Sequence, residues 1–256
     1  MLPELFDLGP VTVYSFGVMV ALSFIVPLPL LRRGIIERGH KGDIAIDFAL
    51  AAAVGGIVGA RVWFLVENRD EVEVVANAFD GDGLTWYGGV IGGAVAVLAV
   101  GRIVHKMRLA EIADSFAAPL AFGQAIGRIG CELSGDGDYG RQTDAPLPFA
   151  HAYPKGTVPT DDRVWATPPM ETIALAIIGL VLWRLRHRLP TGGLIALYLL
   201  LTGLERFLIE FIRRNPDTVG PLTTPQVVAL IGMAVGGAWL AALRTRGAPS
   251  RPAHAA

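Results

Sequence analysis

The chain has 256 residues, of which 52% are hydrophobic and 18% charged, against about 25% charged residues in a typical soluble domain. Its mean hydropathy is +0.49, and its formal net charge of −1 excludes a nucleic-acid partner because no basic excess is available to neutralise phosphates. One cysteine, Cys131, excludes an internal disulfide and a multi-cysteine metal site, and the five histidines show no ligand spacing. We therefore expect neither a metal nor a cofactor.

Seven apolar stretches approach the length of about 20 residues that a helix needs to cross a bilayer. In chain order they are residues 11–31, 44–66, 85–104, 110–133, 168–183, 192–212 and 222–243. We predict an all-α, polytopic membrane protein with about seven transmembrane helices. The first stretch is not interpreted as a signal peptide, because residues 1–10 contain no Lys or Arg.

The distribution of basic residues predicts the orientation in the membrane, because Lys and Arg gather in cytoplasmic loops. Of the 22 Lys and Arg residues, thirteen lie at or beyond the ends of the odd-numbered stretches, six lie in the opposite loops, and three lie inside stretches. This predicts a periplasmic N-terminus, a cytoplasmic C-terminus and an external loop at about 134–167. We expect one membrane domain over 1–246, followed by a flexible cytoplasmic tail over 247–256, in the bacterial inner membrane.

The three basic residues inside apolar stretches are Arg61, Arg128 and Arg206. An intramembrane arginine costs roughly 2.5–3.5 kcal/mol on insertion scales and is usually functional or paired. All three fall in the outer half of a helix that runs outward, which suggests one shared site. Because the planar guanidinium suits phosphate and carboxylate, a phospholipid headgroup is the simplest anion at that depth.

The competing interpretation is structural. Arginines also snorkel toward water or pair with carboxylates, and the candidate partners here are Glu67, Glu132, Glu171 and Glu210. For Arg61, which is close to Glu67 and to its helix end, the two interpretations are evenly balanced. For Arg128 and Arg206 we favour function.

The segments around these arginines resemble one family in their order along the chain. Residues 123–131 read Gly-Gln-Ala-Ile-Gly-Arg-Ile-Gly-Cys, and a small, acidic run then leads to Gly140-Arg141. This run resembles the signature of the prolipoprotein diacylglyceryl transferases. Further segments that resemble the family are residues 59–61, 87–92, 113–119, 168–171 and 206–213.

The resemblance implies a transferase. The family moves diacylglyceryl from phosphatidylglycerol to the lipobox cysteine thiol in the signal peptide of a preprolipoprotein, and glycerol phosphate leaves. By match of motif, Arg128 and Arg206 would hold the phosphate and stabilise the leaving anion, where a fixed charge in a dry site counts for more than in water. The same positive charges would favour the acceptor thiolate. The implied partners are these two substrates and the surrounding membrane lipids.

Further roles follow by the same match. Glu210 would orient Arg206 or Arg213, and Glu171 would orient another arginine. The glycines would let the backbone approach lipid and peptide. The expected substrate-binding set is Arg61, Gly88, Gly89, Gly127, Gly130, Asp136, Asp138, Gly140, Glu171, Glu210 and Arg213, beside the catalytic set Arg128, Arg206 and Tyr87.

The chain departs from the family pattern at positions near the expected chemistry. Tyr87 stands where the family usually has His, Cys131 stands where it usually has Asn, Ser15-Phe16 replaces an aromatic-Tyr pair, and residues 132–139 are about one residue longer than usual. Because no predicted span contains a histidine, the general base is open. The candidates are Tyr87, Asp136, Asp138 and His151, or none beyond the arginine charges.

Several of these residues also have structural interpretations. A phenol is a poor general base near neutral pH, so Tyr87 is expected to hydrogen-bond the phosphate, unless it is an interfacial aromatic beside Trp86. Cys131 is interpreted as a packed side chain rather than a nucleophile, since free cysteines are usually buried. Asp136 and Asp138 precede or follow glycine and could simply solvate a turn.

Three other functions compete with this interpretation: a non-catalytic phospholipid-binding relative, a transferase with another thiol or amine acceptor, and a small-solute transporter. A phospholipid-binding relative that is non-catalytic or uses another acceptor would explain the departures near the expected chemistry. A small-solute transporter would also hold intramembrane charges, but it would often show two matching halves or broken helices. Neither feature is visible, so diacylglyceryl transfer is the preferred interpretation.

Overall fold

The computed structural model describes residues 1–7, 9, 12–68 and 85–245. The chain divides into two compact units, which are described separately. The first unit consists of Met1–Pro27 and Phe116–Ala256, and the second consists of Leu28–Ser115. The predicted tail over 247–256 lies outside the described residues, and one domain over 1–246 stays a prediction.

The helices follow the predicted spans closely. They are α1 (Ser15–Ile25), α2 (Leu28–Ile36), α3 (Ile44–Glu67), α4 (Trp86–Ala99) with the π-helical turn η1 (Val100–Val104), α5 (Leu109–Ser134), α6 (Thr167–Leu185), α7 (Gly193–Glu210) and α8 (Thr224–Thr245). The first predicted span is divided into α1 and α2 at Val26-Pro27. The Val26 amide still donates to the Leu22 carbonyl, but Pro27 has no N–H with which to continue the ladder.

The length and composition of the helices indicate a multi-pass membrane protein. Among the described residues, five helical stretches are long and apolar enough to cross a membrane: Ser15–Ile36, Ile44–Glu67, Tyr87–Val104, Thr167–Leu185 and Thr224–Thr245. The helices α5 and α7 are not among the five, and both carry several charged side chains. A total of seven spans and the orientation of the termini therefore stay predictions.

Three short antiparallel hairpins accompany the helices, which an all-helical prediction did not include. They are β1 (Glu4–Asp7) with β2 (Thr12–Tyr14), β3 (Ala150–Tyr153) with β4 (Thr160–Trp165), and β5 (Asp217–Val219) with β6 (Leu222–Thr223). The predicted loop at 134–167 contains the β3–β4 hairpin, in which Ala150 pairs with Trp165 and His151 with Val164. The Leu2 amide donates to the Leu133 carbonyl and so ties the N-terminal segment to the end of α5.

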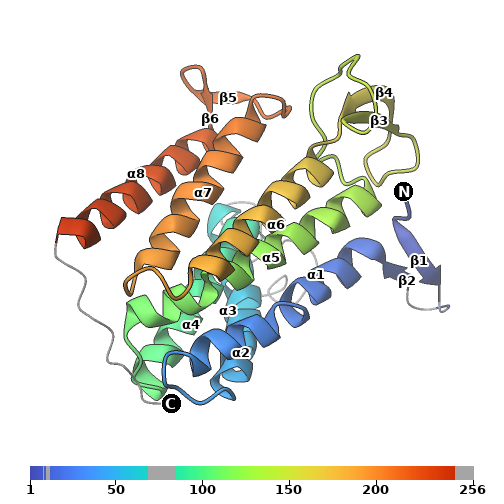
Figure 1. The fold of residues 1–256 in the computed structure, drawn as a ribbon. Coiled ribbons are helices and arrows are strands. Elements are labelled where there is room, and N and C mark those ends of the chain that lie inside the picture. Colours follow the sequence, from blue (N-terminus) through green and yellow to red (C-terminus); the bar gives the residue numbers. More distant parts are fainter. Residues whose placement is uncertain (8, 10–11, 69–84, 246–256) are drawn as a thin grey trace. The chain divides into compact units, whose positions relative to one another are not determined.

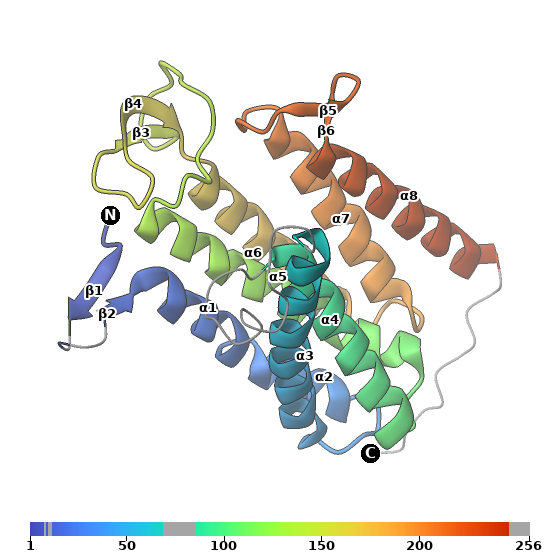
Figure 2. The ribbon, with the colours of Figure 1, turned by 180° about the vertical axis from the view of Figure 1, so that it is seen from behind.

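The core of the first unit lies between α5, α6 and α7. Small side chains of α5 allow the other two helices to approach, and the cluster consists of Ala117, Ala118, Ala121, Ile178, Leu182, Leu194 and Tyr198. Within this unit, α5 and α7 end at the same side on which α6 and α8 begin (Figure 1). The hairpins β3–β4 and β5–β6 lie at that end, as the view from behind also shows (Figure 2). Residues that are distant in the sequence are thereby gathered there.

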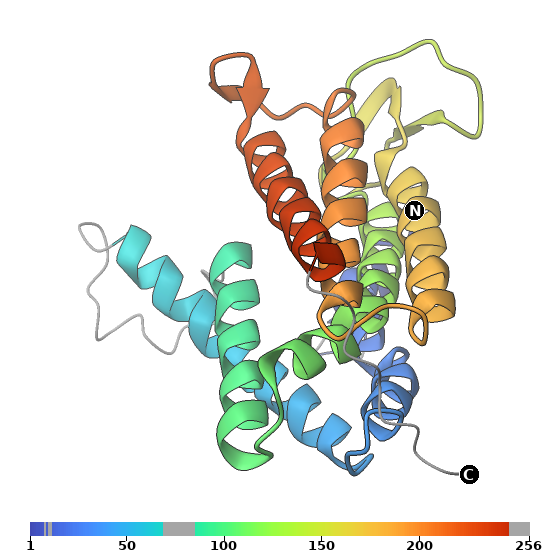
Figure 3. The same cartoon turned by 60° about the vertical axis from the view of Figure 1, so that its left-hand side comes forward.

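In the second unit, α3 and α4 lie side by side (Figure 3) and pack backbone to backbone. A Cβ added at Gly55, Gly59, Gly88 or Gly92 would overlap the partner helix. Close approach through glycines is the usual way in which helices associate in lipid, where burial of apolar surface does not drive their contact. Gly88, an expected substrate contact, therefore packs against α3.

Candidate functional site

The site is built around Glu171, which begins the second turn of α6 and is only 2% exposed. Its Oε2 lies 2.7 Å from Arg128 Nε on α5, and its Oε1 lies 3.0 Å from Arg206 Nη1 on α7. The same Oε1 lies 3.4 Å from Arg213 Nη1. One buried carboxylate thus holds three guanidinium groups from two other parts of the chain, which offsets the desolvation of all four charges.

A second carboxylate comes from the segment that follows α5. Asp138 pairs with Arg128 Nη1 through Oδ2 and with Arg213 Nη2 through Oδ1. The Thr167 hydroxyl donates to the Asp138 carbonyl at 2.6 Å and so fixes this segment against the start of α6. Burial alone would raise the pKa of Asp138, but Arg213 and Arg128 hold that pKa below its usual value.

The third carboxylate, Glu210, is the last residue of α7 and is buried. Its Oε2 lies 2.9 Å from Arg206 Nη2, because a spacing of four residues places both side chains on one face of the helix. Its Oε1 accepts hydrogen bonds from Asn215 Nδ2 at 2.6 Å and from the Thr223 hydroxyl at 2.8 Å. The segment between α7 and α8 therefore orients Glu210, and Glu210 orients Arg206.

The three arginines differ in exposure. The side chains of Arg128 and Arg206 are 26% and 25% exposed, whereas that of Arg213 is 7% exposed. The Arg213 carbonyl accepts a hydrogen bond from Arg141 Nε at 2.8 Å, and the Arg141 amide donates to the Ile212 carbonyl. Arg213 is thus enclosed by the protein, while Arg128 and Arg206 each keep an accessible edge.

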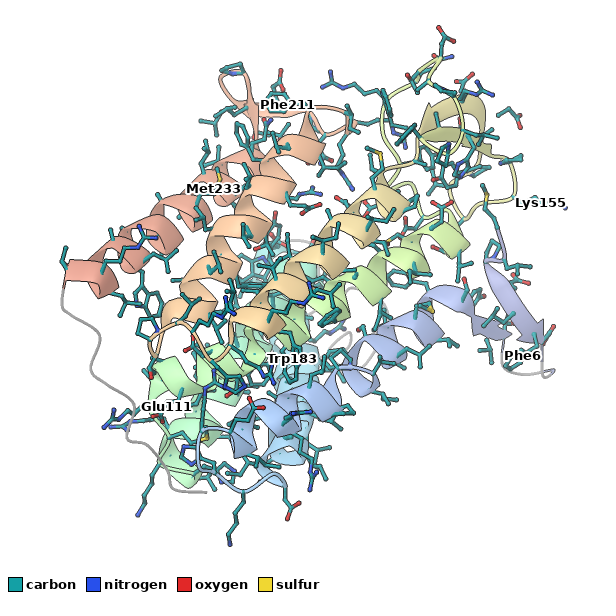
Figure 4. The ribbon with its side chains drawn as sticks, viewed as in Figure 1. Phe6, Glu111, Lys155, Trp183, Phe211 and Met233 are labelled. Atoms are coloured by element: carbon teal, nitrogen blue, oxygen red, sulfur yellow. The ribbon has the colours of Figure 1, made fainter. Side chains whose placement is uncertain are left out.

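A polar cavity of about 440 Å³ lies beside the cluster, within the usual size range of small-molecule sites. It is lined by Gly137, Asp138, Tyr139, Arg213, Arg214 and Asn215. Figure 4 shows Phe211 at the end of α7 from which this cavity opens and Trp183 toward the far end of α6. The cavity therefore belongs to the same end of the first unit as the hairpins.

Cys131 and Asp136 lie at the edge of the cluster. Cys131 is buried, and its Sγ is 3.8 Å from both Arg128 Nη1 and Asp138 Oδ2. Burial raises the pKa of Asp136, whose Oδ1 accepts a hydrogen bond from the Asp138 amide. Atoms of Cys131, Asp136 and Asp138 that could bind a metal ion lie within 4.8 Å of one another, but the Asp138 carboxylate is already paired with the Arg128 guanidinium. A second cation there would be repelled, so we assign no metal site.

His151, a sequence candidate for the base, belongs to a different cluster. Its Nε2 lies 2.9 Å from Glu132 Oε1, and the Tyr153 hydroxyl donates to Glu132 Oε2 at 2.7 Å. The Tyr153 ring stacks on the Tyr139 ring. The Arg214 guanidinium also lies over the Tyr139 ring, with its Cζ 4.2 Å from the ring centroid. Burial and Glu132 raise the pKa of Tyr153, which therefore stays protonated as a donor.

The remaining predicted site residues of the N-terminal half belong to the second unit. These are Arg61, Tyr87, Gly88 and Gly89. The Arg61 guanidinium lies over the Phe64 ring with its Cζ 5.4 Å from the centroid, and Tyr87 is 44% exposed. Their part in the site stays a prediction.

The predicted glycines of the first unit have different surroundings. At Gly127, no atom of the described residues that an added Cβ would meet lies within 4 Å of the Cβ position, so its face of α5 is open within the described part of the chain. Gly130 faces Met19 of α1, and Gly140 faces the Ile212 carbonyl and Trp165. Gly140 therefore serves close packing of the protein on itself, and its amide donates to the Trp165 carbonyl.

Three residues of the cluster were not predicted from the sequence: Glu205, Asn215 and Thr223. Glu205 immediately precedes Arg206 inside a predicted span, so the rule that singled out the arginines also applies to it. Asn215 and Thr223 carried no signal of this kind, because ordinary polar residues near a helix end are common. Only the fold brings them to Glu210.

Comparison with known proteins adds an independent observation. The family model described as prolipoprotein diacylglyceryl transferase matches residues 3–242. The chain belongs to the prolipoprotein diacylglyceryl transferase family. The matched range contains every residue of the site in this transferase-family chain.

Individual relatives match over nearly their whole length. The chain is 28% identical over 249 residues to the phosphatidylglycerol–prolipoprotein diacylglyceryl transferase of Clostridium tetani, covering 92% of this chain and 95% of the relative. It is 29% identical to the second such transferase of Clostridium perfringens, covering 93% and 92%. It is 32% identical to that of Dehalococcoides mccartyi, covering 91% and 90%.

Proposed function

We propose that this chain transfers diacylglyceryl from phosphatidylglycerol to the lipobox cysteine thiol of a preprolipoprotein and releases glycerol phosphate. The reaction would take place in the inner membrane, with the active site toward the periplasmic leaflet. The membership of the family and the names of the relatives support the activity. The basic-residue distribution supports the side of the membrane.

The observation that carries this proposal is the sharing of Glu171 by Arg128 and Arg206. The two arginines come from different helices, and one carboxylate holds both at 2.7 and 3.0 Å. Each keeps about a quarter of its side chain exposed, so a phosphate can approach both without breaking the pairs that hold them. This is a preorganised anion site, in which the orientation of the cations is set before the substrate arrives.

The bound lipid would be oriented by its own polarity. Its phosphate would contact Arg128 and Arg206, and its glycerol headgroup would enter the polar cavity beside Asp138 and Asn215. The acyl chains would extend in the opposite direction, along the apolar lengths of α5 and α7. The carbon that receives the thiol would then lie on the membrane side of the phosphate.

In the chemical step, the thiolate sulfur forms a bond to that carbon while the carbon–oxygen bond to phosphate breaks. The phosphate oxygen keeps the electron pair and leaves as glycerol phosphate. The charge on the phosphate rises as the bond breaks, and Arg128 and Arg206 stabilise that increase. Arg213 is paired with Asp138 and Glu171 and would mainly hold these two carboxylates in place, and it also lines the cavity that would receive the headgroup.

Two experiments test this function. Expression of the chain should restore growth to cells depleted of their own diacylglyceryl transferase. The purified protein should add diacylglyceryl to a lipobox peptide in vesicles that contain phosphatidylglycerol, as measured by the increase in peptide mass. A peptide with serine in place of the lipobox cysteine should not react. Lipid binding without any transfer would instead identify a non-catalytic relative.

A further inference from the structure

The cluster contains a carboxyl group on α7 that its arginines do not engage in an ion pair. Asp138, Glu171 and Glu210 are each ion-paired to two or more of the three arginines. Glu205 has no ion pair within the part of the chain that the structure describes. Its Oε1 is shielded from solvent and has no hydrogen-bond partner there. A buried polar atom without a partner is costly and calls for an explanation.

The surroundings of Glu205 come from three helices. It interacts electrostatically with Arg128 on α5, with Glu171 on α6, and with Arg206 and Arg213 at the end of α7. The Tyr198 side chain, two turns earlier on α7, also interacts electrostatically with the Glu205 carboxyl group. The three arginines are already balanced by three paired carboxylates. Of the carboxyl groups on the three helices of the cluster, Glu205 is therefore the one that gains or loses a proton without breaking an ion pair. Asp136 also has no ion pair among the described residues, but it follows the end of α5 instead of lying on a helix of the cluster.

Glu205 directly precedes Arg206 on α7 and lies on the membrane side of it, away from the cavity. An α-helix rises 1.5 Å per residue, so Glu205 lies about 7.5 Å before Glu210, away from the helix end where the cavity opens. A lipid with its phosphate against Arg128 and Arg206 has its reacting carbon on this same, membrane side. In a direct displacement the nucleophile approaches opposite to the leaving oxygen, and its proton must be removed on that side.

We propose that Glu205 is the general base that accepts the proton of the acceptor thiol. The inference rests on the proposed function and supplies the base that no histidine in a predicted span can provide. The S–H proton passes to the Glu205 carboxylate as the sulfur–carbon bond forms and the carbon–oxygen bond breaks. The proton then passes to the departing glycerol phosphate, which restores the carboxylate and balances the reaction.

The main test replaces Glu205 by glutamine, which keeps the size of the side chain and removes its titration. General acid–base catalysis contributes typically about 10²–10⁴-fold, so the turnover rate of Glu205→Gln should fall by that amount while KM for phosphatidylglycerol changes little. The rate of the unmodified protein should rise with pH as the base ionises, and this rise should be absent in Glu205→Gln. Asp161→Asn, which likewise replaces an acid by its amide but at an exposed position of β4, should keep both rate and pH profile.

A second measurement separates a base from a structural residue. A selenol is already ionised at neutral pH and needs no base, so a selenocysteine lipobox peptide should restore most of the rate to Glu205→Gln. Equal losses with thiol and selenol acceptors would overturn the proposal, as would full thiol activity in Glu205→Gln. A large rise in KM for the lipid would instead mean that Glu205 binds a headgroup hydroxyl, which also overturns it. Absence of transfer by the unmodified protein would refute the proposed function itself.

Discussion

Among single residues, Arg128 and Arg206 are the ones proposed to hold the lipid phosphate, and the geometry of their ion pairs makes this proposal testable. Each guanidinium uses two nitrogens to pair with carboxylates, an arrangement that depends on a planar group. Lysine keeps the charge but offers only a point donor. Arg128→Lys and Arg206→Lys should each lower transfer of labelled diacylglyceryl to a lipobox peptide by roughly a hundred- to a thousandfold.

The matched control for these variants is Arg163→Lys. Arg163 is exposed in β4, and within the described part of the chain its side chain makes a single long hydrogen bond, from Nη1 to the Ala145 carbonyl at 3.4 Å. This variant should transfer normally. Expression in the membrane should be compared for all three proteins. Near-normal transfer by well-expressed Arg128→Lys and Arg206→Lys variants would contradict a geometric clamp and leave only a general positive field.

Asp138 gives a prediction about pH. Its pKa is lowered in the folded protein because it pairs with Arg213 and Arg128, so its ionised form stabilises the fold. That contribution is fully present above the unfolded-state pKa, about 3.9, and is lost as pH falls through the lower folded-state pKa. Asp138→Asn should therefore unfold at a lower temperature than the unmodified protein at pH 7.

The difference in unfolding temperature between Asp138→Asn and the unmodified protein should depend on pH. The gap in unfolding temperature should stay constant from about pH 7 to 5 and narrow only below about pH 4, where the carboxylate protonates. Thermal unfolding of the detergent-solubilised protein across this range measures it. A gap that closes between pH 7 and 5 would mean that Asp138 is not held ionised by the arginines.

Among the helices, the contact between α7 and α8 helps to hold the site in place. A Cβ at Gly236 would lie 2.5 Å from the Ala196 carbonyl oxygen and 2.9 Å from the Leu200 nitrogen. Gly236→Ala should therefore destabilise the protein by about 1–3 kcal/mol through overpacking. It should also slow transfer, because α8 begins directly after Thr223, which supports Glu210.

The neighbouring residue provides the control. Gly237 is in the same helix, and among the described residues no neighbouring atom lies within 4 Å of its Cβ position. Gly237→Ala should be neutral or stabilising by up to about 1 kcal/mol, because alanine is the better helix former. Unfolding temperature and transfer rate are measured for both variants in one detergent. Similar effects of the two substitutions would show that α7 and α8 do not pack as closely as described.

At the scale of the whole molecule, the prediction concerns orientation. Lys155 is exposed in the turn between β3 and β4, and Arg188 is exposed between α6 and α7 (Figure 4 marks the former). A reporter active only in the periplasm should be active when inserted at Lys155 and inactive at Arg188. A reporter active only in the cytoplasm should give the reverse pattern. A cytoplasmic signal from the Lys155 position would overturn the periplasmic location of the site.

Much of the architecture was predictable because hydropathy acts locally. Each predicted span coincides with one observed helix, or with two where Pro27 interrupts the ladder, and most helix ends agree within a few residues. The cost of an arginine in lipid is also a property of the span that contains it, so Arg128 and Arg206 could be singled out. The β3–β4 hairpin was missed because its pairing joins short, mostly polar segments that carry no clear alternation.

The apolar helices, the charges inside them and the order of the family motifs could all be predicted from the sequence, because each depends on residues that are close along the chain. Which charges meet depends instead on how the helices pack. Glu171 is 35 residues from Arg206 and 42 from Arg213, and several carboxylates of equal chemistry competed for those arginines. The same packing paired His151 with Glu132 and left Glu205 without an ion pair among the described residues. Pairing in a dry site depends on distance and burial, which no local pattern encodes.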